Sequence, residues 1–184
     1  MLELRAAASH DRAFLWEVHR TALRPAVEAT WGWDEAFQLQ YFAEHFTTSD
    51  RFIVCVDGVD AGVLQFTVKG DHVFLASVAL LPEHQGRGIG TDLVNMVLAE
   101  GRRHNLPVRL QVLKVNRARK LYERLGFEAT VRARRTCTWN GRTLGAESAG
   151  TSARGDELRR CFYQVVREDT CDRRSSLGSF RPPA

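Results

Sequence analysis

The sequence predicts an α/β protein with a mixed sheet, and three observations support this fold class. Short apolar or alternating runs, typical of strands, are interspersed with longer runs in which apolar residues recur at helical spacing. A glycine-rich turn lies in mid-chain between a predicted strand and a predicted helix. Consecutive strands precede the turn and a helix, a strand, a helix and a strand follow it, which differs from the regular repeat of a doubly wound fold.

The N-terminal part is predicted to contain one strand and two helices. Leu2–Ala6 alternates apolar and polar residues, as a strand does. A helix is expected to follow the capping residue Ser9 and to end before Pro25, because proline disfavours a helical residue before it. A second helix is expected over residues 35–46, with residues 28–34 as the loop between the two.

The middle of the chain is expected to supply most of the sheet. Asp57-Gly58 reads as the turn of a hairpin, and Gly126 reads as the residue that ends a short helix. In order, the expected elements are a hairpin of residues 52–56 and 61–68, a strand over Val73–Leu80, a helix from the glycine turn to about Arg103, a strand over 108–115, a helix over 117–125 and a strand over 127–132.

The C-terminal part departs from this pattern, because the composition shifts toward Arg, Thr, Ser and Gly after about Arg134. A long loop is expected over residues 140–156 and a last strand over residues 158–166. The length of 184 residues suits one domain with a substantial core. We therefore predict a single domain over residues 1–168 and a disordered tail over residues 169–184.

Composition excludes several classes of protein. The net charge of +4 is mild, and the arginines form no basic stripe with interleaved aromatic residues, so no nucleic-acid partner is expected. No apolar run is long enough to cross a membrane. The four cysteines show no paired spacing and no signal peptide precedes them, which favours reduced thiols and a cytoplasmic protein. Because His and Cys residues form no ligand pairs, no metal is expected. A homodimer is one assembly that the sequence allows.

The most informative segment is the glycine-rich turn within residues 78–91. Backbone N–H groups at such a turn and at the following helix N-terminus form an anion site. The P-loop pattern fails because no lysine follows the glycines, and the dinucleotide pattern fails in either register. Gln85, Gly88 and Gly90 fit a third pattern, Gln/Arg-x-x-Gly-x-Gly/Ala, without a gap. The alternative is a tight strand-to-helix turn that binds no ligand.

The turn and a downstream segment together resemble a known family. The matching features are the strand Val73–Leu80, the turn over residues 82–90, and the segment with Asn116, Leu121-Tyr122 and Leu125-Gly126-Phe127. In this order and spacing, residues 73–127 resemble the acyl-CoA-binding core of the GNAT superfamily of N-acetyltransferases. The resemblance implies a mostly antiparallel central sheet with splayed central strands and flanking helices. The pantetheine arm of the ligand would then lie between the two splayed strands.

The resemblance also implies a co-substrate, acetyl-CoA, and a set of site residues. It makes Tyr122 the proton donor to the leaving thiolate; the alternative is a half-buried core residue at helical spacing with Ala118 and Leu125. The implied CoA ligands are Val78, Ala79, Leu80, Gln85, Gly86, Arg87, Gly88, Ile89, Gly90, Thr91 and Asn116.

The acceptor side of the site is less well defined. Glu28, Trp31 and Trp33 lie in the segment that shapes the acceptor pocket in the resembled family, and they could hold a cationic amine by charge and cation–π contact. The alternative is that both tryptophans pack in the core. Residues that could act as the general base are His72, Glu35, Asp34 and Glu28.

The predicted function is transfer of an acetyl group from acetyl-CoA to a primary amine. Direct transfer in a ternary complex is expected, because no cysteine lies in a setting typical of a nucleophile. The alternative is a catalytically weak domain that binds acyl-CoA as a sensor or holds a partner, and the unusual C-terminal segment motivates it. A nucleotide-binding protein is the weakest reading, since both fingerprints fail.

Overall fold

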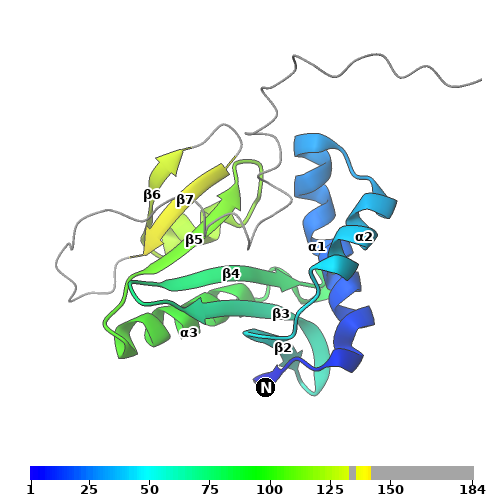
Figure 1. Ribbon diagram of the computed structural model, residues 1–184. Coiled ribbons are helices and arrows are strands. Elements are labelled where there is room, and N and C mark those ends of the chain that lie inside the picture. Colours follow the sequence, from blue (N-terminus) through cyan, green and yellow to red (C-terminus); the bar gives the residue numbers. More distant parts are fainter. Residues whose placement is uncertain (133–135, 142–184) are drawn as a thin grey trace, which may run out of the picture. The chain divides into compact units, whose positions relative to one another are not determined.

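The computed structural model of the chain describes residues 1–132 and 136–141, which form a seven-stranded sheet with flanking helices (Figure 1). Within these residues the strand order is β1-β2-β3-β4-β5-β7-β6, and the neighbouring pairs are antiparallel except for β4 with β5. The predicted mixed, mostly antiparallel sheet is confirmed.

The elements are β1 (Leu2–Ala6), η1 (Ser9–Asp11), α1 (Arg12–Trp31), α2 (Glu35–Glu44), β2 (Arg51–Val56), β3 (Val59–Val68), β4 (Val73–Leu80), η2 (Pro82–His84), α3 (Ile89–Arg103), β5 (Val108–Leu113), α4 (Arg119–Arg124), β6 (Phe127–Arg132) and β7 (Thr136–Gly141).

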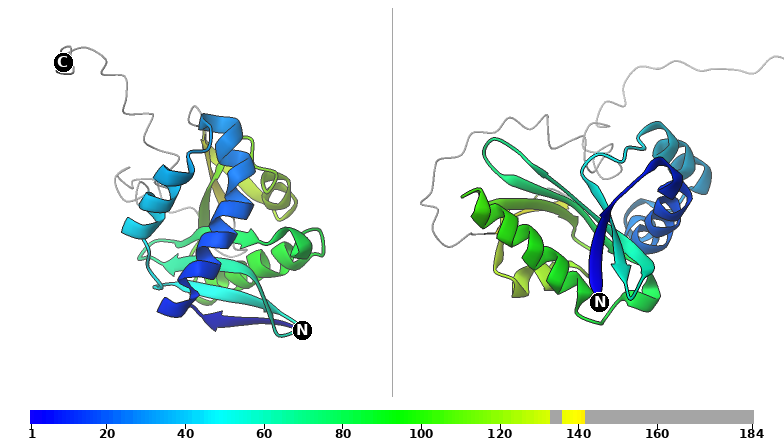
Figure 2. Two further views of the ribbon diagram at one scale, coloured as in Figure 1. Left: turned by 90° about the vertical axis from the view of Figure 1, so that its right-hand side faces the viewer. Right: turned by 90° about the horizontal axis from the view of Figure 1, so that it is seen from below.

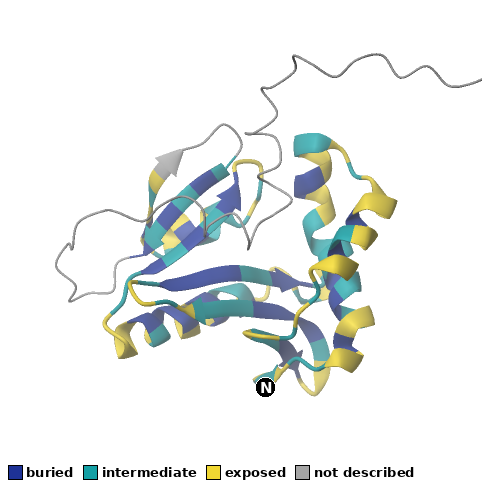
Figure 3. Ribbon diagram, viewed as in Figure 1, coloured by how far each residue is buried: buried dark blue, intermediate teal, exposed yellow. Residues whose placement is uncertain are grey.

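Helices cover both faces of the sheet (Figure 2). α1 and α2 lie on one face, where Leu15 and Val18 share a buried cluster with Ala79 of β4. α3 lies on the other face, where Leu93 and Val97 belong to a larger cluster. Burial is concentrated on the sides of these helices that face the sheet, and β4 is buried over most of its length (Figure 3). β4 is therefore a central strand that both helical layers contact.

The first helix is longer than the sequence predicts, because α1 continues through Pro25 to Trp31. A proline inside a helix removes one backbone hydrogen bond, but it does not stop a helix whose later residues remain packed. Ala26 and Val27, directly after the proline, are buried. The helix ends at Gly32, which has a φ of 85°. Residues 28–31 thus belong to the helix, and their expected position in a loop is wrong.

Strand β7 was not expected, and it lies between β5 and β6 in the sheet. Its residues alternate in burial, as in a strand with one face on the core: Cys137 and Trp139 are buried, and Thr138 between them is half-buried. A loop was expected to begin at Asn140, and this expectation is wrong for Asn140 and Gly141, which belong to β7. The strand expected over residues 158–166 and the tail expected over residues 169–184 lie outside the described residues.

Candidate active site

A gap opens in the middle of the sheet between β4 and β5. Their parallel ladder ends at the pair Leu75–Leu110, although β4 continues to Leu80 and β5 to Leu113. Among the described residues, no ladder joins these two ends, which is the splaying of central strands expected from the sequence. Val78 lies in this stretch of β4. The edge of β4 beside the gap can therefore pair with an extended ligand as it would with an added strand.

The turn between β4 and α3 presents backbone N–H groups at the open end of this gap. Gly86 and Gly88 have φ values of 73° and 84°, in the left-handed region that favours glycine. A Cβ at either position would meet nothing within 4 Å, so backbone conformation rather than crowding calls for glycine here. None of the hydrogen bonds made by the described part of the chain uses the N–H groups of residues 86–90. Together with the positive end of α3, these groups have the arrangement that favours an anion.

The other turn residues have distinct places. The side-chain amide of Gln85 donates from Nε2 to the carbonyl oxygen of Leu80 at 2.8 Å, so Gln85 braces the turn against the end of β4. Arg87 is exposed and Thr91 is half-buried, whereas Ile89 is buried in the core beneath α3. Solvent or a ligand can thus reach Arg87 and the exposed backbone of Gly86 and Gly88.

Tyr122 lies on α4 and is buried, with 6% of its surface exposed. Its ring packs edge-on against Phe127, with the ring centroids 5.7 Å apart. Burial raises the pKa of its phenol to about 12, so Tyr122 keeps its proton at neutral pH. Tyr122 is therefore a core residue whose phenol is protonated. Its packing in the core does not conflict with the role of proton donor that the resemblance implies.

Asn116 stabilises the turn between β5 and α4. Its Oδ1 accepts the backbone N–H of Ala118 at 2.9 Å, and α4 begins later than expected, at Arg119. Because the oxygen is engaged, the amide NH₂ of Asn116 is the group that can contact a ligand.

The segment expected to bind a cationic amine contacts a cation of this chain, Arg24. Nε of Arg24 lies 3.6 Å from a carboxylate oxygen of Glu28, and its guanidinium carbon lies 5.8 Å from the centre of the Trp33 ring. Nε1 of Trp33 donates to Glu35 at 2.6 Å. Trp31 is the last residue of α1. Arg24 thus makes with Glu28 and Trp33 the kinds of contact that were expected for an acceptor amine.

The remaining candidates for a general base also have local partners. Asp34 caps α2, because its Oδ1 accepts the backbone N–H of Phe37 at 3.0 Å. His72 lies just before β4, away from the glycine turn, and its Nδ1 is 2.6 Å from Asp71. A structural explanation therefore exists for each of them.

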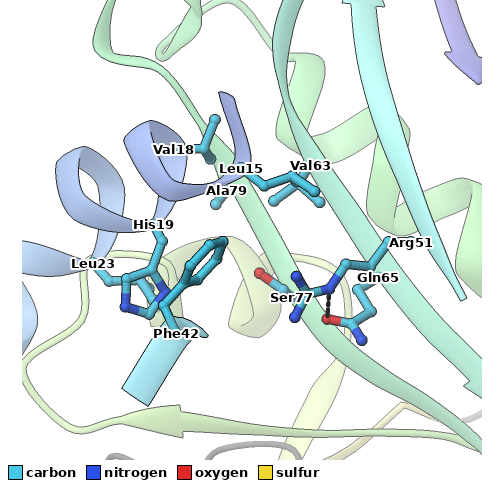
Figure 4. A pocket seen from close by; sticks show the side chains of 10 residues that line it. All are labelled: Leu15, Val18, His19, Leu23, Phe42, Arg51, Val63, Gln65, Ser77 and Ala79. Carbon is cyan, nitrogen blue, oxygen red and sulfur yellow. Dashed lines mark hydrogen bonds between the residues drawn. The ribbon is translucent and has the colours of Figure 1, made fainter. Parts of the chain in front are cut away.

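A pocket lies between α1, α2 and strands β2 to β4 (Figure 4). Figure 4 shows His19 on one side of this pocket, with the Arg51 guanidinium and the Gln65 amide on the other. Ser77 and Ala79 contribute from β4. The lining side chains are Leu15, Val18, His19, Leu23, Phe42, Arg51, Val63, Gln65, Ser77 and Ala79.

Comparison with known proteins decides the family. The model of the acetyltransferase (GNAT) family matches residues 13–127. The chain belongs to the GNAT acetyltransferase family. The matched range includes the β4–β5 gap, the glycine turn and α4, so the family and the acyltransferase class predicted from the sequence are confirmed.

Solved structures of GNAT proteins share this fold. The PaiA N-acetyltransferase of Thermoplasma acidophilum, in complex with coenzyme A, is 16% identical over 77% of this chain and 98% of its own, with a TM-score of 0.65. The ribosomal-protein-S18-alanine N-acetyltransferase of Escherichia coli is 19% identical over 83% of this chain and 100% of its own, with a TM-score of 0.59. A comparison with curated proteins finds no match.

Sequence reasoning missed the polar residues of the pocket in this GNAT chain. Nε2 of His19 lies 3.3 Å from Oε1 of Gln38. Burial is the largest effect on the pKa of His19 and lowers it; the bond to Gln38 opposes this shift, and the charge of Arg51 adds a smaller lowering. The sequence signal that could have indicated His19 is its helical spacing from Leu15 and Val18, since the three residues share the apolar face of α1. His19 is thus an uncharged imidazole beside the pocket.

Two further observations concern the described residues alone. No group of three or more His, Cys, Asp or Glu residues there is arranged to hold a metal ion. In the same part of the chain, no helix has the length and apolar character needed to cross a membrane.

Proposed function

We propose that this GNAT protein transfers an acetyl group from acetyl-CoA to a primary amine by direct transfer within a ternary complex. The observation that carries the proposal is the junction of the β4–β5 gap with the glycine turn. The gap offers a strand edge to an extended pantetheine arm, and the turn offers N–H groups to a pyrophosphate. An extended amide-containing arm that ends in phosphates is the ligand that these two features fit.

The residues of this chain divide the binding between backbone and side chain. We propose backbone pairing with the arm at Val78 and Leu80, and an amide contact from Asn116. The thioester of acetyl-CoA supplies the acetyl group. The pyrophosphate would lie against the N–H groups of residues 86–90, with Arg87 adding a positive charge.

Tyr122 is proposed to donate a proton to the departing thiolate. A phenol with a pKa of about 12 stays protonated over the pH range in which an amine can act as a nucleophile. The acceptor must lose a proton before it attacks, because a free alkylamine is charged at neutral pH. Backbone N–H groups at the edge of β4 can donate to the carbonyl oxygen as charge develops on it.

The cysteines within the described residues support direct transfer over a covalent acyl-enzyme. Cys55 and Cys137 are both buried. Burial raises the pKa of the Cys55 thiol, and a hydrogen bond to Asp60 adds to this effect. A thiol held in its protonated form is a poor nucleophile.

The test has a binding part and a catalytic part. Calorimetric titration with acetyl-CoA should release or absorb heat, and the absence of heat at high micromolar ligand would overturn the binding claim. A panel of amines, amino acids and peptides, with release of the CoA thiol as readout, tests transfer. Saturable release that depends on one acceptor supports the enzyme. Binding without release from any acceptor would instead support a domain that senses acyl-CoA or holds a partner.

A further inference from the structure

The pocket between α1, α2 and strands β2 to β4 adjoins the gap between β4 and β5. Ser77 and Ala79 line the pocket, and both follow Leu75, the last residue of β4 that pairs with β5. The arm of acetyl-CoA is proposed to bind along this same stretch of β4. An acceptor that approaches the thioester from the face opposite α3 would therefore pass through the pocket.

β4 carries one extra residue, Ala76, at the point where it separates from β5. Its neighbours Leu75 and Ser77 pair with two adjacent residues of β3, which leaves Ala76 without a partner of its own there. An extra residue reverses the alternation of the side chains that follow it. Leu75 and Val78 thus both pack in the cluster beneath α3, whereas Ser77 and Ala79 line the pocket on the other face. The bulge therefore turns these two residues of the gap toward the pocket.

His19 is the base among the described residues that line the pocket. Apart from hydrocarbon and aromatic side chains, the rest of this lining consists of Arg51, Gln65 and Ser77. A guanidinium has no lone pair to offer, and an amide or a hydroxyl is a weak base near neutral pH. An imidazole exchanges its proton in that range. Figure 4 shows His19 on the helical side of the pocket, opposite Ser77 of β4.

Contacts with α1 and α2 hold the His19 ring in place. Its Nε2 lies 3.3 Å from Oε1 of Gln38, and its centroid lies 5.6 Å from that of Trp16 and 5.7 Å from that of Phe42. Since the amide oxygen accepts, Nε2 carries the ring proton and Nδ1 the lone pair. The described part of the chain makes no hydrogen bond to Nδ1. This nitrogen is therefore the one that can take a proton.

The surroundings keep the imidazole in the uncharged form that accepts a proton. Burial is the largest effect and lowers the pKa of His19, the bond to Gln38 opposes this, and the charge of Arg51 on β2 adds a smaller lowering. Arg51 itself donates to Gln65 at 3.1 Å. The Trp33 ring, with its centroid 6.3 Å from that of His19, carries no charge. No carboxylate belongs to the described lining of the pocket.

We propose that His19 is a catalytic residue, the general base that takes the proton of the attacking amine on Nδ1. The inference rests on the proposed acetyl transfer and adds the group that accepts the proton. The uncharged amine nitrogen forms a bond to the acetyl carbon as the C–S bond breaks, and the electron pair of that bond leaves with the sulfur. The proton released by the nitrogen passes to His19 and then to water. The sulfur takes a proton from Tyr122, which regains one from water.

The dependence of the rate on pH tests this role in the wild type. We would measure release of the CoA thiol at saturating acetyl-CoA, with 2-phenylethylamine, spermidine, lysine and a peptide with a free N-terminal alanine as acceptors. For each amine that is acetylated, kcat/KM should fall on the acid side of the pH at which His19 titrates. NMR titration of the His19 ring in the protein bound to CoA locates that pH.

Gln38→Glu separates a catalytic from a structural role. A carboxylate beside Nε2 favours the imidazolium, so the acid limb of kcat/KM and the NMR titration of His19 should both move to higher pH, by the same amount. A histidine that only packs in the structure would not couple these two measurements. Gln40→Glu, on the exposed side of α2, should leave both in place.

His19→Gln removes the base and keeps a donor toward Gln38. At neutral pH it should lower kcat/KM about 100-fold or more, abolish the acid limb and leave the affinity for acetyl-CoA unchanged in calorimetry. His10→Gln is the matched control, because the His10 side chain is 78% exposed and does not line the pocket. It should keep both the rate and the pH profile of the wild type.

The outcomes distinguish this role from acetyl transfer itself. A wild-type profile without a limb where His19 titrates, a limb that persists in His19→Gln, or a limb that stays in place while Gln38→Glu moves the NMR titration would overturn the role and leave acetyl transfer standing. No release with any of these amines from folded wild-type protein would overturn the proposed function and the role together. The wild-type profile requires no variant, so it decides the matter even if His19→Gln fails to fold.

Discussion

Nε2 of His19 lies 3.3 Å from Oε1 of Gln38, and this contact joins α1 to α2 at the side of the pocket. Gln38 is buried, with 4% of its surface exposed, and the His19 ring also stacks on Trp16 with centroids 5.6 Å apart. Because an amide oxygen only accepts, this bond places the imidazole proton on Nε2. Nδ1 then carries the lone pair.

His19 should be uncharged at neutral pH, and Gln38→Glu should change that. Burial lowers the pKa of His19, so the folded protein binds its proton less readily than the unfolded chain does. The free energy of unfolding should therefore fall as the pH drops below about 6.5. A carboxylate at position 38 should raise the pKa of His19, because a nearby negative charge favours the charged imidazolium. NMR titration of the ring measures both values.

Gln40→Glu is the matched control for that experiment. Gln40 lies on the exposed side of α2, where its amide donates to Glu44. The new carboxylate would face solvent and should hardly alter the titration of His19. A wild-type His19 that is charged at pH 7 would contradict the prediction.

Local patterns were enough to predict the strand and the glycine turn at which we propose that acetyl-CoA binds. The strand Val73–Leu80 has the predicted bounds, because a continuous apolar run between turn residues defines a buried strand. The left-handed conformation of Gly86 and Gly88 follows from the same local logic. Both features depend on residues that are close together in the chain, and sequence patterns are most informative about such local structure.

The pocket depends on contacts between distant segments. The pocket brings His19 of α1 together with Arg51 of β2 and Ser77 of β4, and no local pattern links these three residues. The helix through Pro25 was missed for a similar reason, since tertiary burial of Ala26 outweighs the local tendency of proline to end a helix. Tertiary packing, rather than propensity, decided both cases.

Tyr122→Phe should lower kcat by about 100-fold or more, which is the usual contribution of a general acid. Phenylalanine keeps the ring that packs against Phe127, so stability and the affinity for acetyl-CoA should change little. Steady-state kinetics with saturating acetyl-CoA would measure the effect. Tyr41→Phe, on α2, controls for the loss of a phenol elsewhere. An unchanged kcat in Tyr122→Phe would remove this residue from the proposed role.

Gly88→Ala should weaken binding of acetyl-CoA. A side chain at a φ of 84° costs about 1–2 kcal/mol, and relief of that strain would reorient the N–H groups of the turn. Gly58→Ala is a matched control, because Gly58 has a φ of 81° in the β2–β3 hairpin and also has open space around its Cα. Thermal unfolding should show a similar loss of stability in both variants. Calorimetry should show a loss of affinity, of about fivefold or more, in Gly88→Ala alone. Equal affinities in the two variants would argue against an anion site at this turn.

Gly62→Ala should disturb the gap from the opposite side of β4. A Cβ at Gly62 would lie 2.2 Å from the carbonyl oxygen of Ala79 and 2.9 Å from Cα of Leu80, both of which are backbone atoms. β3 and β4 must then move apart at the residues that flank the gap and the pocket. We expect a loss of stability of about 1–3 kcal/mol, as for overpacking in a core, together with weaker binding of acetyl-CoA. Gly70→Ala, where nothing lies within 4 Å, should be nearly neutral in thermal unfolding and in calorimetric titration. If Gly62→Ala matched Gly70→Ala in both measurements, the close approach of β3 to β4 would not be what holds the edge of the gap in place.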